Sequence, residues 1–394
     1  MRYHPRLMAI TLADRIKSLP PYLFAEIDKL KKEERAKGAD LIDLGIGDPD
    51  IPTPSAIVDA MAKAVHNTAY HRYPSYEGMP RFREAAAAWY QKRFGVKLDP
   101  EAEVVALIGS KEGIAHFPVA FTNPGDVNLC TNPGYPVYAT ATMFSGGVPY
   151  LVPLRRENGF LPDLKAIPAD VLKKSKILFF NYPNNPTAAV ANKAFFEEAA
   201  AFCAKHGIIG AHDNAYSEIY FDEAHPPMSY LQVPGAKEWG IEFHSLSKTY
   251  NMTGWRIGFA VGNKDLIAGL GKVKTNVDSG AFEAIQEASI TAFSLGADVL
   301  KPLRETWKRR NAACIEGLRA AGYDPFVSSA AFYVWTPVPK GTTSKQFCMD
   351  VLKKTGVVIT PGNGFGEHGE GYFRMALTQN EDRIREAVTR MKNL

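Results

Sequence analysis

Residues 245–258 read SLSKTYNMTGWRIG, and this stretch decides how the chain is interpreted. Lys248 lies among small hydroxyl residues, and Arg256 follows it between two glycines. An amine that attacks an aldehyde needs small neighbours, whereas hydroxyls and a guanidinium suit an anionic phosphate. The stretch therefore predicts a lysine that forms a Schiff base with pyridoxal 5'-phosphate (PLP). A surface lysine in a Ser/Thr loop would read similarly on its own, so the decision depends on the residues upstream.

The composition fits a large folded protein without a charged partner surface. The chain has 394 residues, and 46% of them are hydrophobic, which is enough for a large core and for two domains. The formal net charge is only +4, and Lys and Arg are scattered among Asp and Glu. We therefore expect neither nucleic acid nor a membrane surface as a partner.

Cysteine usage and the N-terminus predict a cytoplasmic protein. Cys130, Cys203, Cys314 and Cys348 are far apart and fit no metal-ligand spacing, so we expect no metal. Free thiols are typical of a reducing compartment. The N-terminus lacks the apolar core of a signal peptide, and no stretch reaches the length of a membrane span.

Seven short apolar runs predict a mainly parallel sheet covered by helices, because such strands are buried on both faces. The runs are 104–108, 127–130, 149–154, 177–181, 208–211, 241–244 and 257–261. Ligands of such sheets collect at the carboxyl ends of the strands. Polar residues that could bind a ligand or take part in catalysis follow four of the runs, namely Ser110, Asn185, Asp213 and Lys248.

The pattern changes after about residue 284, where a long amphipathic stretch over 303–321 precedes shorter elements. Strands are expected at 332–336, 357–360 and 372–377, with helices at 344–355 and 381–392. We therefore predict a large domain over 46–284 and a smaller α+β domain over 285–394. Residues 1–45 are expected to join the small domain or to reach a partner subunit.

Asp213 follows a predicted strand, and Tyr216 comes three residues later. A carboxylate at a strand end can hydrogen-bond a pyridine nitrogen and keep it protonated, which makes the ring an electron sink. Tyr216 could reach the ring hydroxyl of the cofactor. The spacing alone is weak, since most Asp-x-x-Tyr sequences are structural.

Three further loops follow predicted strands. Residues 181–187, NYPNNPT, form a stiff Asn/Pro loop from which Asn185 could donate its amide to the ring oxygen. Residues 109–113, GSKEG, place backbone N–H groups and a hydroxyl at a helix start, which suits a phosphate. Tyr135 lies in a rigid Pro-Gly-Tyr-Pro turn and could stack on a flat ring, although plain packing is equally compatible.

Arg374 lies within an apolar strand, YFRM. Burying a guanidinium without an anion is costly, and its fork of donors fits a carboxylate. The α-carboxylate of an amino acid is the expected partner, with an internal salt bridge as the alternative.

Taken in order, these residues resemble those of fold-type I PLP enzymes, specifically the class I and II aminotransferases. The resemblance extends from residues 44–50, LGIGDPD, to the last helix, and the composite of Ser-x-Ser-Lys with Gly-Trp-Arg-x-Gly is highly specific. It implies the α/β fold of PLP-dependent transferases of fold type I. It also implies small-molecule amino acids and 2-oxo acids as substrates, and a homodimer with shared active sites.

The likeness implies a role for each matching residue. Lys248 is expected to be the Schiff-base lysine and the base for the proton shift, while Asp213 pairs with the pyridine nitrogen. The other expected cofactor ligands are Asn185 and Tyr216 at the ring oxygen, Tyr135 on the ring face, and Ser110, Lys111, Ser245 and Arg256 at the phosphate. Gly47, Asn185 and Arg374 are expected to hold the substrate carboxylate. Tyr73 is expected to reach the neighbouring subunit's site.

One position departs from the family. Many members read Asn-Pro-Thr-Gly, whereas this chain has Asn185-Pro186-Thr187-Ala188. An alanine at this place predicts that the backbone does not adopt a positive φ.

Within the family the chain is most similar to the LL-diaminopimelate aminotransferases, on residues 72–78 (RYPSYEG), 109–116 (GSKEGIAH) and 181–187. These enzymes exchange an amino group between glutamate/2-oxoglutarate and tetrahydrodipicolinate/LL-diaminopimelate in lysine biosynthesis. The glutamate–pyruvate (alanine) aminotransferases share similar strings and remain an alternative. A distal ammonium and carboxylate would need polar groups, for which the candidates are Tyr22, Tyr76, Glu77, Asn276 and Asp278.

Two other readings stay open. A PLP-dependent C–S lyase of the same fold would keep the cofactor and change the reaction. A regulatory or binding protein on a degenerate scaffold is disfavoured by the retention of Lys248, Asp213 and Arg374. His116, His212 and His244 are expected to be structural.

Overall fold

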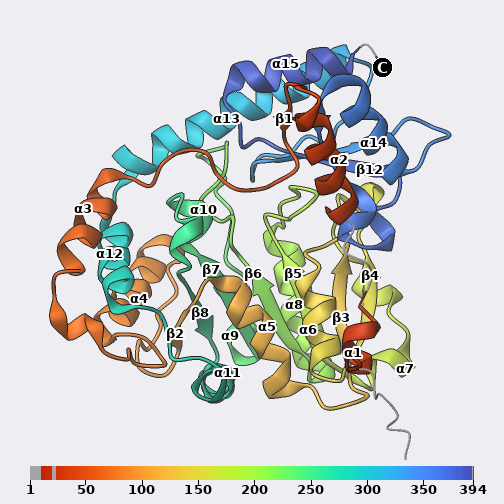
Figure 1. The fold of residues 1–394 in the computed structure, drawn as a ribbon. Helices are drawn as coiled ribbons and strands as arrows, with labels where there is room; N and C mark the ends of the chain where they lie inside the picture. Colours follow the sequence, from red (N-terminus) through yellow and green to blue (C-terminus); the bar gives the residue numbers. More distant parts are fainter. Residues whose placement is uncertain (1–9, 20–23, 393) are drawn as a thin grey trace, which may run out of the picture.

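A seven-stranded sheet forms the centre of the computed structural model, which describes residues 10–19, 24–392 and 394 (Figure 1). The strand order is β2-β8-β7-β6-β5-β3-β4, and only β8 runs antiparallel to its neighbours. The strands are β2 (Val104–Leu107), β3 (Val127–Asn132), β4 (Val148–Pro153), β5 (Ser175–Asn181), β6 (Ile209–Asp213), β7 (Gly240–Ser245) and β8 (Gly258–Gly262). The predicted α/β class and mainly parallel seven-stranded sheet are therefore confirmed.

The sheet is buried on both faces, which explains why its strands read as continuous apolar runs. Along β5, Leu178 and Phe180 pack into one core, whereas Ile177 and Phe179 pack into another on the opposite face. Helices packed into the first core are α3 (Ser55–Ala64), α4 (Pro80–Phe94), α8 (Lys193–His206), α9 (Ala236–Trp239), α10 (Leu246–Thr249) and α12 (Glu283–Ser294). Helices on the second are α5 (Ser110–Phe121), α6 (Val137–Phe144) and α11 (Lys264–Val277). The short helix α7 (Ala169–Leu172) precedes β5.

The C-terminal part builds a smaller sheet of order β11-β12-β9, antiparallel throughout. Its strands are β9 (Tyr333–Pro337), β11 (Thr360–Pro361) and β12 (Tyr372–Ala376), and its helices are α13 (Ala297–Ala320), α14 (Ser344–Thr355) and α15 (Glu381–Met391). The predicted strand at 357–360 is divided, because β10 (Val357–Val358) pairs instead with β1 (Ile42–Asp43). The domain boundaries 1–45, 46–284 and 285–394 stay predictions.

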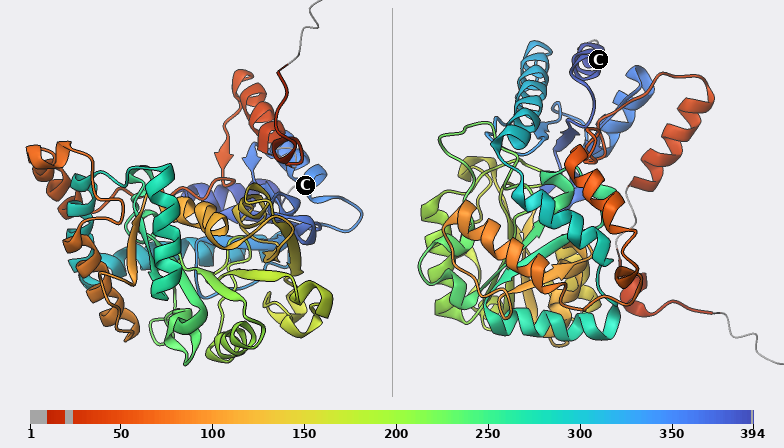
Figure 2. Two further views of the ribbon diagram at one scale, coloured as in Figure 1. Left: turned by 90° about the horizontal axis from the view of Figure 1, so that it is seen from below. Right: turned by 90° about the vertical axis from the view of Figure 1, so that its left-hand side faces the viewer.

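The N-terminal segment contributes to the C-terminal part. Helix α2 (Phe24–Ala36) lies at the side of the molecule in Figure 2 and packs on α14 through Ile27, Leu30 and Leu352. The preceding helix is α1 (Asp14–Lys17).

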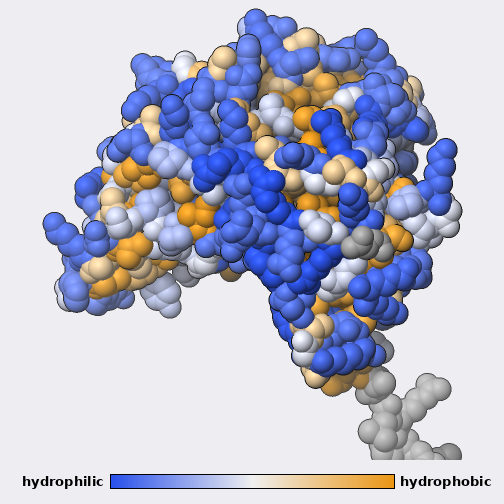
Figure 3. All heavy atoms as spheres, turned by 90° about the horizontal axis from the view of Figure 1, so that it is seen from above, coloured by the Kyte–Doolittle hydropathy of each residue, from blue (hydrophilic) through white to orange (hydrophobic). Residues whose placement is uncertain are grey.

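The face shown in Figure 3 is mainly hydrophilic, with hydrophobic residues scattered over it. Among the described residues, no helix has the length and apolarity needed to cross a membrane.

The carboxyl ends of all strands of the large sheet except β8 lie at the same edge. Strand β2 is parallel to β7, because both are antiparallel to β8, and β7, β6 and β5 are parallel. The last residues of β5, β6 and β7 are Asn181, Asp213 and Ser245. This edge is where ligands bind in open α/β sheets.

Candidate active site

A cavity of about 730 Å³ opens at this edge and collects most of the residues singled out in the sequence. Its lining includes Gly47, Ser110, Lys111, Tyr135, Asn185, Asp213, Tyr216, Ser245, Lys248, Arg256 and Arg374. Two candidates are not part of it, since Tyr73 is 90% exposed and Tyr76 is also at the surface. Tyr22 lies outside the described residues.

Lys248 lies on the short helix α10, directly after β7, and its side chain lines the cavity. Ser245 begins this helix, and its hydroxyl accepts a hydrogen bond from the Ser247 N–H (3.2 Å). The Lys248 Nζ donates to the Gly47 carbonyl at 2.7 Å. Burial lowers the pKa of this amine to about 8, and the nearby Asp48 opposes the shift. A substantial neutral fraction near neutral pH suits a nucleophilic amine.

Gly47 is a position where only glycine fits. A Cβ there would collide with the hydroxyl of Tyr333. The same hydroxyl lies 2.8 Å from the Tyr216 hydroxyl, and both tyrosines line the cavity. The role of Tyr333 is not evident from the sequence, where it lies within the apolar run of strand β9.

Asp213 is a buried carboxylate in which one oxygen accepts a hydrogen bond and the other does not. The Tyr138 hydroxyl donates to Oδ2 at 2.8 Å. The other oxygen, Oδ1, has no hydrogen-bond partner among the described residues, although it is buried. Burial raises the pKa of this carboxyl. A buried acceptor without a donor is costly, so this oxygen fits a ligand N–H such as that of a pyridinium ring.

The turn between β2 and α5 forms a cradle for an anion. Gly109 has φ 76°, and a side chain there would collide with the guanidinium of Arg256. Ser110 is the first residue of α5, and a Cβ on Gly258 would lie 2.9 Å from its backbone N. Lys111 and Ser245 line the same cavity. The two glycines let the Arg256 guanidinium and the Ser110 backbone approach closely, and N–H groups, hydroxyls and cations gathered in this way fit a phosphate group.

Arg374 is buried without an anionic partner. Its Nη1 donates to Asn185 Oδ1 and its Nη2 to the Gly45 carbonyl, both at 2.7 Å, and its Nε is unsatisfied. Rings of Tyr333 and Phe365 lie 4.4 and 4.6 Å from the guanidinium carbon. Within the described ranges, no carboxylate forms an ion pair with it, so the internal salt bridge considered above is wrong. A ligand carboxylate fits this unpaired charge.

The Asn/Pro loop corrects one prediction. Ala188 has φ 62°, so its backbone does adopt the left-handed conformation that the alanine seemed to exclude. Neighbouring polar contacts enforce this conformation. Asn184 Oδ1 accepts hydrogen bonds from the N–H (2.9 Å) and hydroxyl (2.8 Å) of Thr187, and Ser328 donates to the Ala188 carbonyl. These contacts offset a left-handed penalty of about 1–2 kcal/mol.

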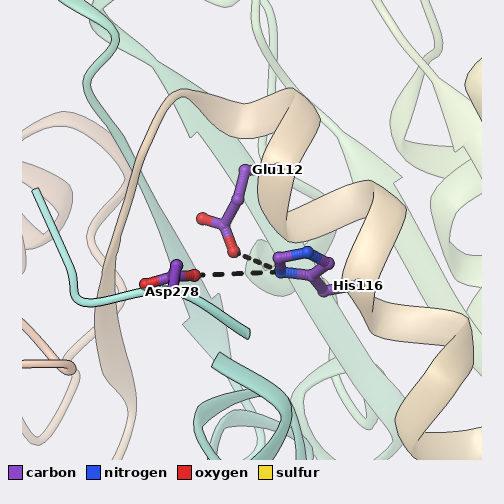
Figure 4. Close-up of side chains that lie close together, drawn as sticks. All are labelled: Glu112, His116 and Asp278. Atoms are coloured by element: carbon purple, nitrogen blue, oxygen red, sulfur yellow. Dashed lines mark hydrogen bonds and ion pairs between the residues drawn. The ribbon is translucent and has the colours of Figure 1, made fainter. Parts of the chain in front are cut away.

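The three histidines lie outside the cavity lining and contact carboxylates. His212 and His244 lie 2.7 and 2.6 Å from the two oxygens of Glu242. His116 Nδ1 faces both Glu112 and Asp278, as Figure 4 shows, at 2.7 and 3.9 Å.

By distance alone, Glu112, His116 and Asp278 could hold a cation. However, the fully buried Lys274 ammonium lies 3.0 Å from Glu112 and 3.1 Å from Asp278. Its charge balances the carboxylates, so we interpret the group as an ion-pair cluster. Glu112 also accepts from the Ile108 N–H (3.1 Å), which fixes the turn before α5.

The remaining distal candidates lie elsewhere. Asn276 donates to the Lys272 carbonyl at 2.8 Å, and the Glu77 carbonyl accepts from the Ala106 N–H at 2.9 Å. Neither residue, nor Asp278, lines the cavity of this chain.

Comparisons with known proteins agree with this geometry. The model of the family "Aminotransferase class I and II" matches residues 39–391. A protein named LL-diaminopimelate aminotransferase from Nitratidesulfovibrio vulgaris (strain DSM 19637 / Miyazaki F) is 59% identical over 97% of this chain and 99% of its own length. One of the same name from Aquifex aeolicus is 56% identical over 97% of this chain and 98% of its own.

Solved structures give the same picture. Substrate-bound BacF from Bacillus subtilis superposes with a TM-score of 0.93 at 39% identity and covers 98% of both chains. A single mutant of Thermus thermophilus aspartate aminotransferase has a TM-score of 0.90 at 28% identity, covering 98% of this chain and 100% of its own.

Proposed function

The chain belongs to the class I and II aminotransferases, and we propose that within this family it is an LL-diaminopimelate aminotransferase of lysine biosynthesis. The reaction would convert LL-diaminopimelate and 2-oxoglutarate into tetrahydrodipicolinate and glutamate. The observation that carries the proposal is the near-full-length identity to relatives of that name, together with a cavity that offers an amine, an open carboxylate oxygen and an unpaired guanidinium. As an aminotransferase, the protein acts on amino acids and 2-oxo acids.

The cavity fits PLP, which when bound supplies a reactive carbonyl and a ring that withdraws electrons from the substrate. We propose that Asp213 Oδ1 accepts the ring N–H and that Asn185 and Tyr216 hold the ring oxygen. Tyr135 would lie on the ring face. The phosphate ligands would be Ser110, Lys111, Ser245 and Arg256. The unsatisfied Asp213 Oδ1 and the anion cradle at the turn between β2 and α5 support this arrangement.

Lys248 is proposed to move the substrate proton. Its Nζ would hold the cofactor at its carbonyl carbon, and as a free amine it would take the proton from the substrate Cα. The lowered pKa leaves the amine able to accept that proton. The Gly47 carbonyl, 2.7 Å from Nζ, would hold the resulting ammonium in place.

Arg374 is proposed to orient the substrate by its α-carboxylate. The guanidinium is kept in one position by the Asn185 and Gly45 oxygens and by the rings beside it. The guanidinium can therefore form an ion pair with a substrate carboxylate without reorganisation of the site. Gly47, whose lack of a side chain lets Tyr333 pack against its backbone, is proposed to contact the same carboxylate.

We further propose a cytoplasmic homodimer with shared active sites. Tyr73 and Tyr76 project from the surface and do not line their own cavity, which suits residues that serve the neighbouring subunit. Tyr22 is proposed as a further substrate contact. The four cysteines are free and buried, as is typical of a reducing compartment.

An amino-donor screen with 2-oxoglutarate as acceptor tests the proposed substrate. The donors are LL- and meso-diaminopimelate, alanine and aspartate, and cystathionine is tested without a keto acid. We expect LL-diaminopimelate to have the highest kcat/KM. Equal or better turnover of alanine, or release of pyruvate and ammonia from cystathionine, would replace the proposal by the alanine aminotransferase or the C–S lyase.

A further inference from the structure

Tyr138 is the side chain that determines which oxygen of Asp213 is available to a ligand. Its hydroxyl donates to Oδ2 at 2.8 Å, while Oδ1 is buried without a partner in the described part of the chain. The Asp213 carbonyl is fixed separately by the Asn181 amide at 2.6 Å. Both the backbone and one carboxylate oxygen are therefore held, and Oδ1 alone is left open at the cavity.

The position of Tyr138 is rigid. Its ring is buried, stacks on Phe179 at 5.3 Å with an interplanar angle of 4°, and meets the edge of Tyr135 at 5.9 Å and 81°. Tyr135 and Tyr138 lie at the start of α6, and the Tyr138 N–H donates to the Tyr135 carbonyl at 3.2 Å. One turn of chain therefore supplies both the residue expected on the ring face and the residue that holds the carboxylate.

The hydroxyl can act only as a donor toward Asp213. Burial and the neighbouring carboxylate raise the pKa of Tyr138 well above 10, so the phenol keeps its proton at all working pH values. For Asp213, burial favours the neutral acid, and the hydrogen bond from Tyr138 is the largest influence in the opposite direction. The phenol thus favours the ionised carboxylate, which is the form that stabilises a protonated pyridine.

We propose that Tyr138 is a positioning residue that holds Asp213 ionised, with Oδ1 directed at the ring nitrogen of the cofactor. It would act through Asp213 without touching the cofactor or substrate. The proposal rests on the PLP site proposed above but not on the identity of the amino donor.

The test compares Tyr138→Phe with the full-length wild-type protein, both loaded with ¹⁵N-labelled PLP in the absence of any amino acid. The ring ¹⁵N chemical shift reports protonation of the nitrogen. We expect Tyr138→Phe to shift this signal toward the unprotonated form and to weaken PLP binding by about tenfold or more, since a hydrogen bond to a charged group contributes about 1.5–3 kcal/mol. In turnover, kcat should fall while KM stays close to wild type.

Tyr182→Phe is the matched control. Tyr182 is equally buried, and its hydroxyl donates to the Phe160 carbonyl at 2.7 Å, away from Asp213. Its loss should lower thermal stability and leave the ¹⁵N signal unchanged. Tyr138→His, which restores an N–H donor, should return part of the wild-type signal. If Tyr138→Phe does not fold, Tyr138→Met, which also lacks the donor, takes its place and should show the same shift.

Two results would overturn the inference. A fully protonated ring nitrogen in Tyr138→Phe with unchanged kcat would show that Asp213 needs no help from Tyr138. A signal that moves equally in Tyr182→Phe would assign the effect to general packing. If the wild type itself bound no PLP, the proposed cofactor site would fail instead, so the two failures are distinguishable.

Discussion

Asp213 and Glu242 are buried carboxylates on neighbouring strands, β6 and β7, and they differ in how many partners they have. Each Glu242 oxygen lies within hydrogen-bonding distance of three groups. These are His244, Tyr90 and Asn214 on Oε1, and His212, Ser229 and the Tyr230 N–H on Oε2. Although burial opposes ionisation, the two histidines hold the pKa of Glu242 well below its usual range. Asp213 has one side-chain donor, and burial raises its pKa.

Two arginines repeat the contrast. Arg310 forms two hydrogen bonds with the carboxylate of Asp50, at 2.6 and 2.8 Å, and a third with the Leu377 carbonyl at 3.0 Å. Arg374 is as deeply buried but has only neutral acceptors.

Two lysines show the same difference between a charge-balanced and an unbalanced side chain. The Lys274 ammonium is balanced by Glu112 and Asp278, whereas the Lys248 ammonium donates to the Gly47 carbonyl. A buried charged group whose partners all lie within the protein stabilises the fold. A buried charged group that lacks such partners is available to bind a ligand.

The largest expected effect comes from exchanging each carboxylate for its amide. Asp213→Asn should lower kcat by on the order of 100-fold or more while the fold is retained, because the ring nitrogen loses its charged acceptor. Glu242→Gln should instead leave kcat of the folded protein close to wild type. It should reduce the free energy of unfolding by about 3–5 kcal/mol, because it breaks a buried charge network. Steady-state kinetics and urea unfolding on both variants measure the two effects. The contrast breaks if Glu242→Gln lowers kcat of the folded protein as much as Asp213→Asn does.

The arginine pair should separate binding from stability. Arg374→Gln should raise KM by about tenfold or more for all amino acids alike, since every substrate carries the α-carboxylate. Arg310→Gln should lower stability and leave KM near wild type, because its partner is Asp50. A selective loss for one substrate in Arg374→Gln would refute the proposed role.

The lysine contrast has a pH signature. Burial lowers the pKa of Lys248 to about 8 from its ordinary 10.5, and only the neutral amine attacks a carbonyl. The rate of PLP capture by the apo protein should therefore rise with pH and level off above about 8. Stopped-flow absorbance measures this rate, and a midpoint near 10.5 would contradict the account.

The same shift affects apo stability. Because the unfolded chain holds this proton more tightly, the free energy of unfolding should rise as pH rises from about 8 toward 10.5. Lys248→Met should remove that rise.

The smallest effect concerns backbone strain instead of charge. Ala188→Gly should stabilise the protein by about 1 kcal/mol in urea unfolding, because glycine adopts φ near 62° without a Cβ clash. PLP affinity should not change. A destabilised variant would indicate that the larger backbone entropy of glycine in the unfolded chain outweighs the relief of strain.

The sequence predicted what depends on local pattern. All seven apolar runs became strands of one sheet, and the motif residues after them lie in one cavity, because parallel strands end at a common edge. Tyr138 and Tyr333 were missed because an isolated tyrosine in an apolar helix or strand reads as core. Their roles appear only when Asp213 and Tyr216, distant in sequence, are brought to them.

Errors arose where distant contacts override local preference. Ala188 was expected to avoid a positive φ, yet side chains from Asn184, Thr187 and Ser328 fix that loop. Asp278 stays an untested candidate for the distal end of the substrate, and in this chain its carboxylate forms an ion pair with Lys274.

Borohydride reduction of the PLP-loaded protein, followed by peptide mass mapping, identifies the lysine that carries the cofactor. Reduction fixes the cofactor to the amine that carries it, so we expect one modified peptide, containing Lys248. Lys111, at the same cavity, and the ion-paired Lys274 serve as internal controls and should remain unmodified. Cofactor on either of those lysines, or on none while the protein is folded, would refute the proposed role of Lys248.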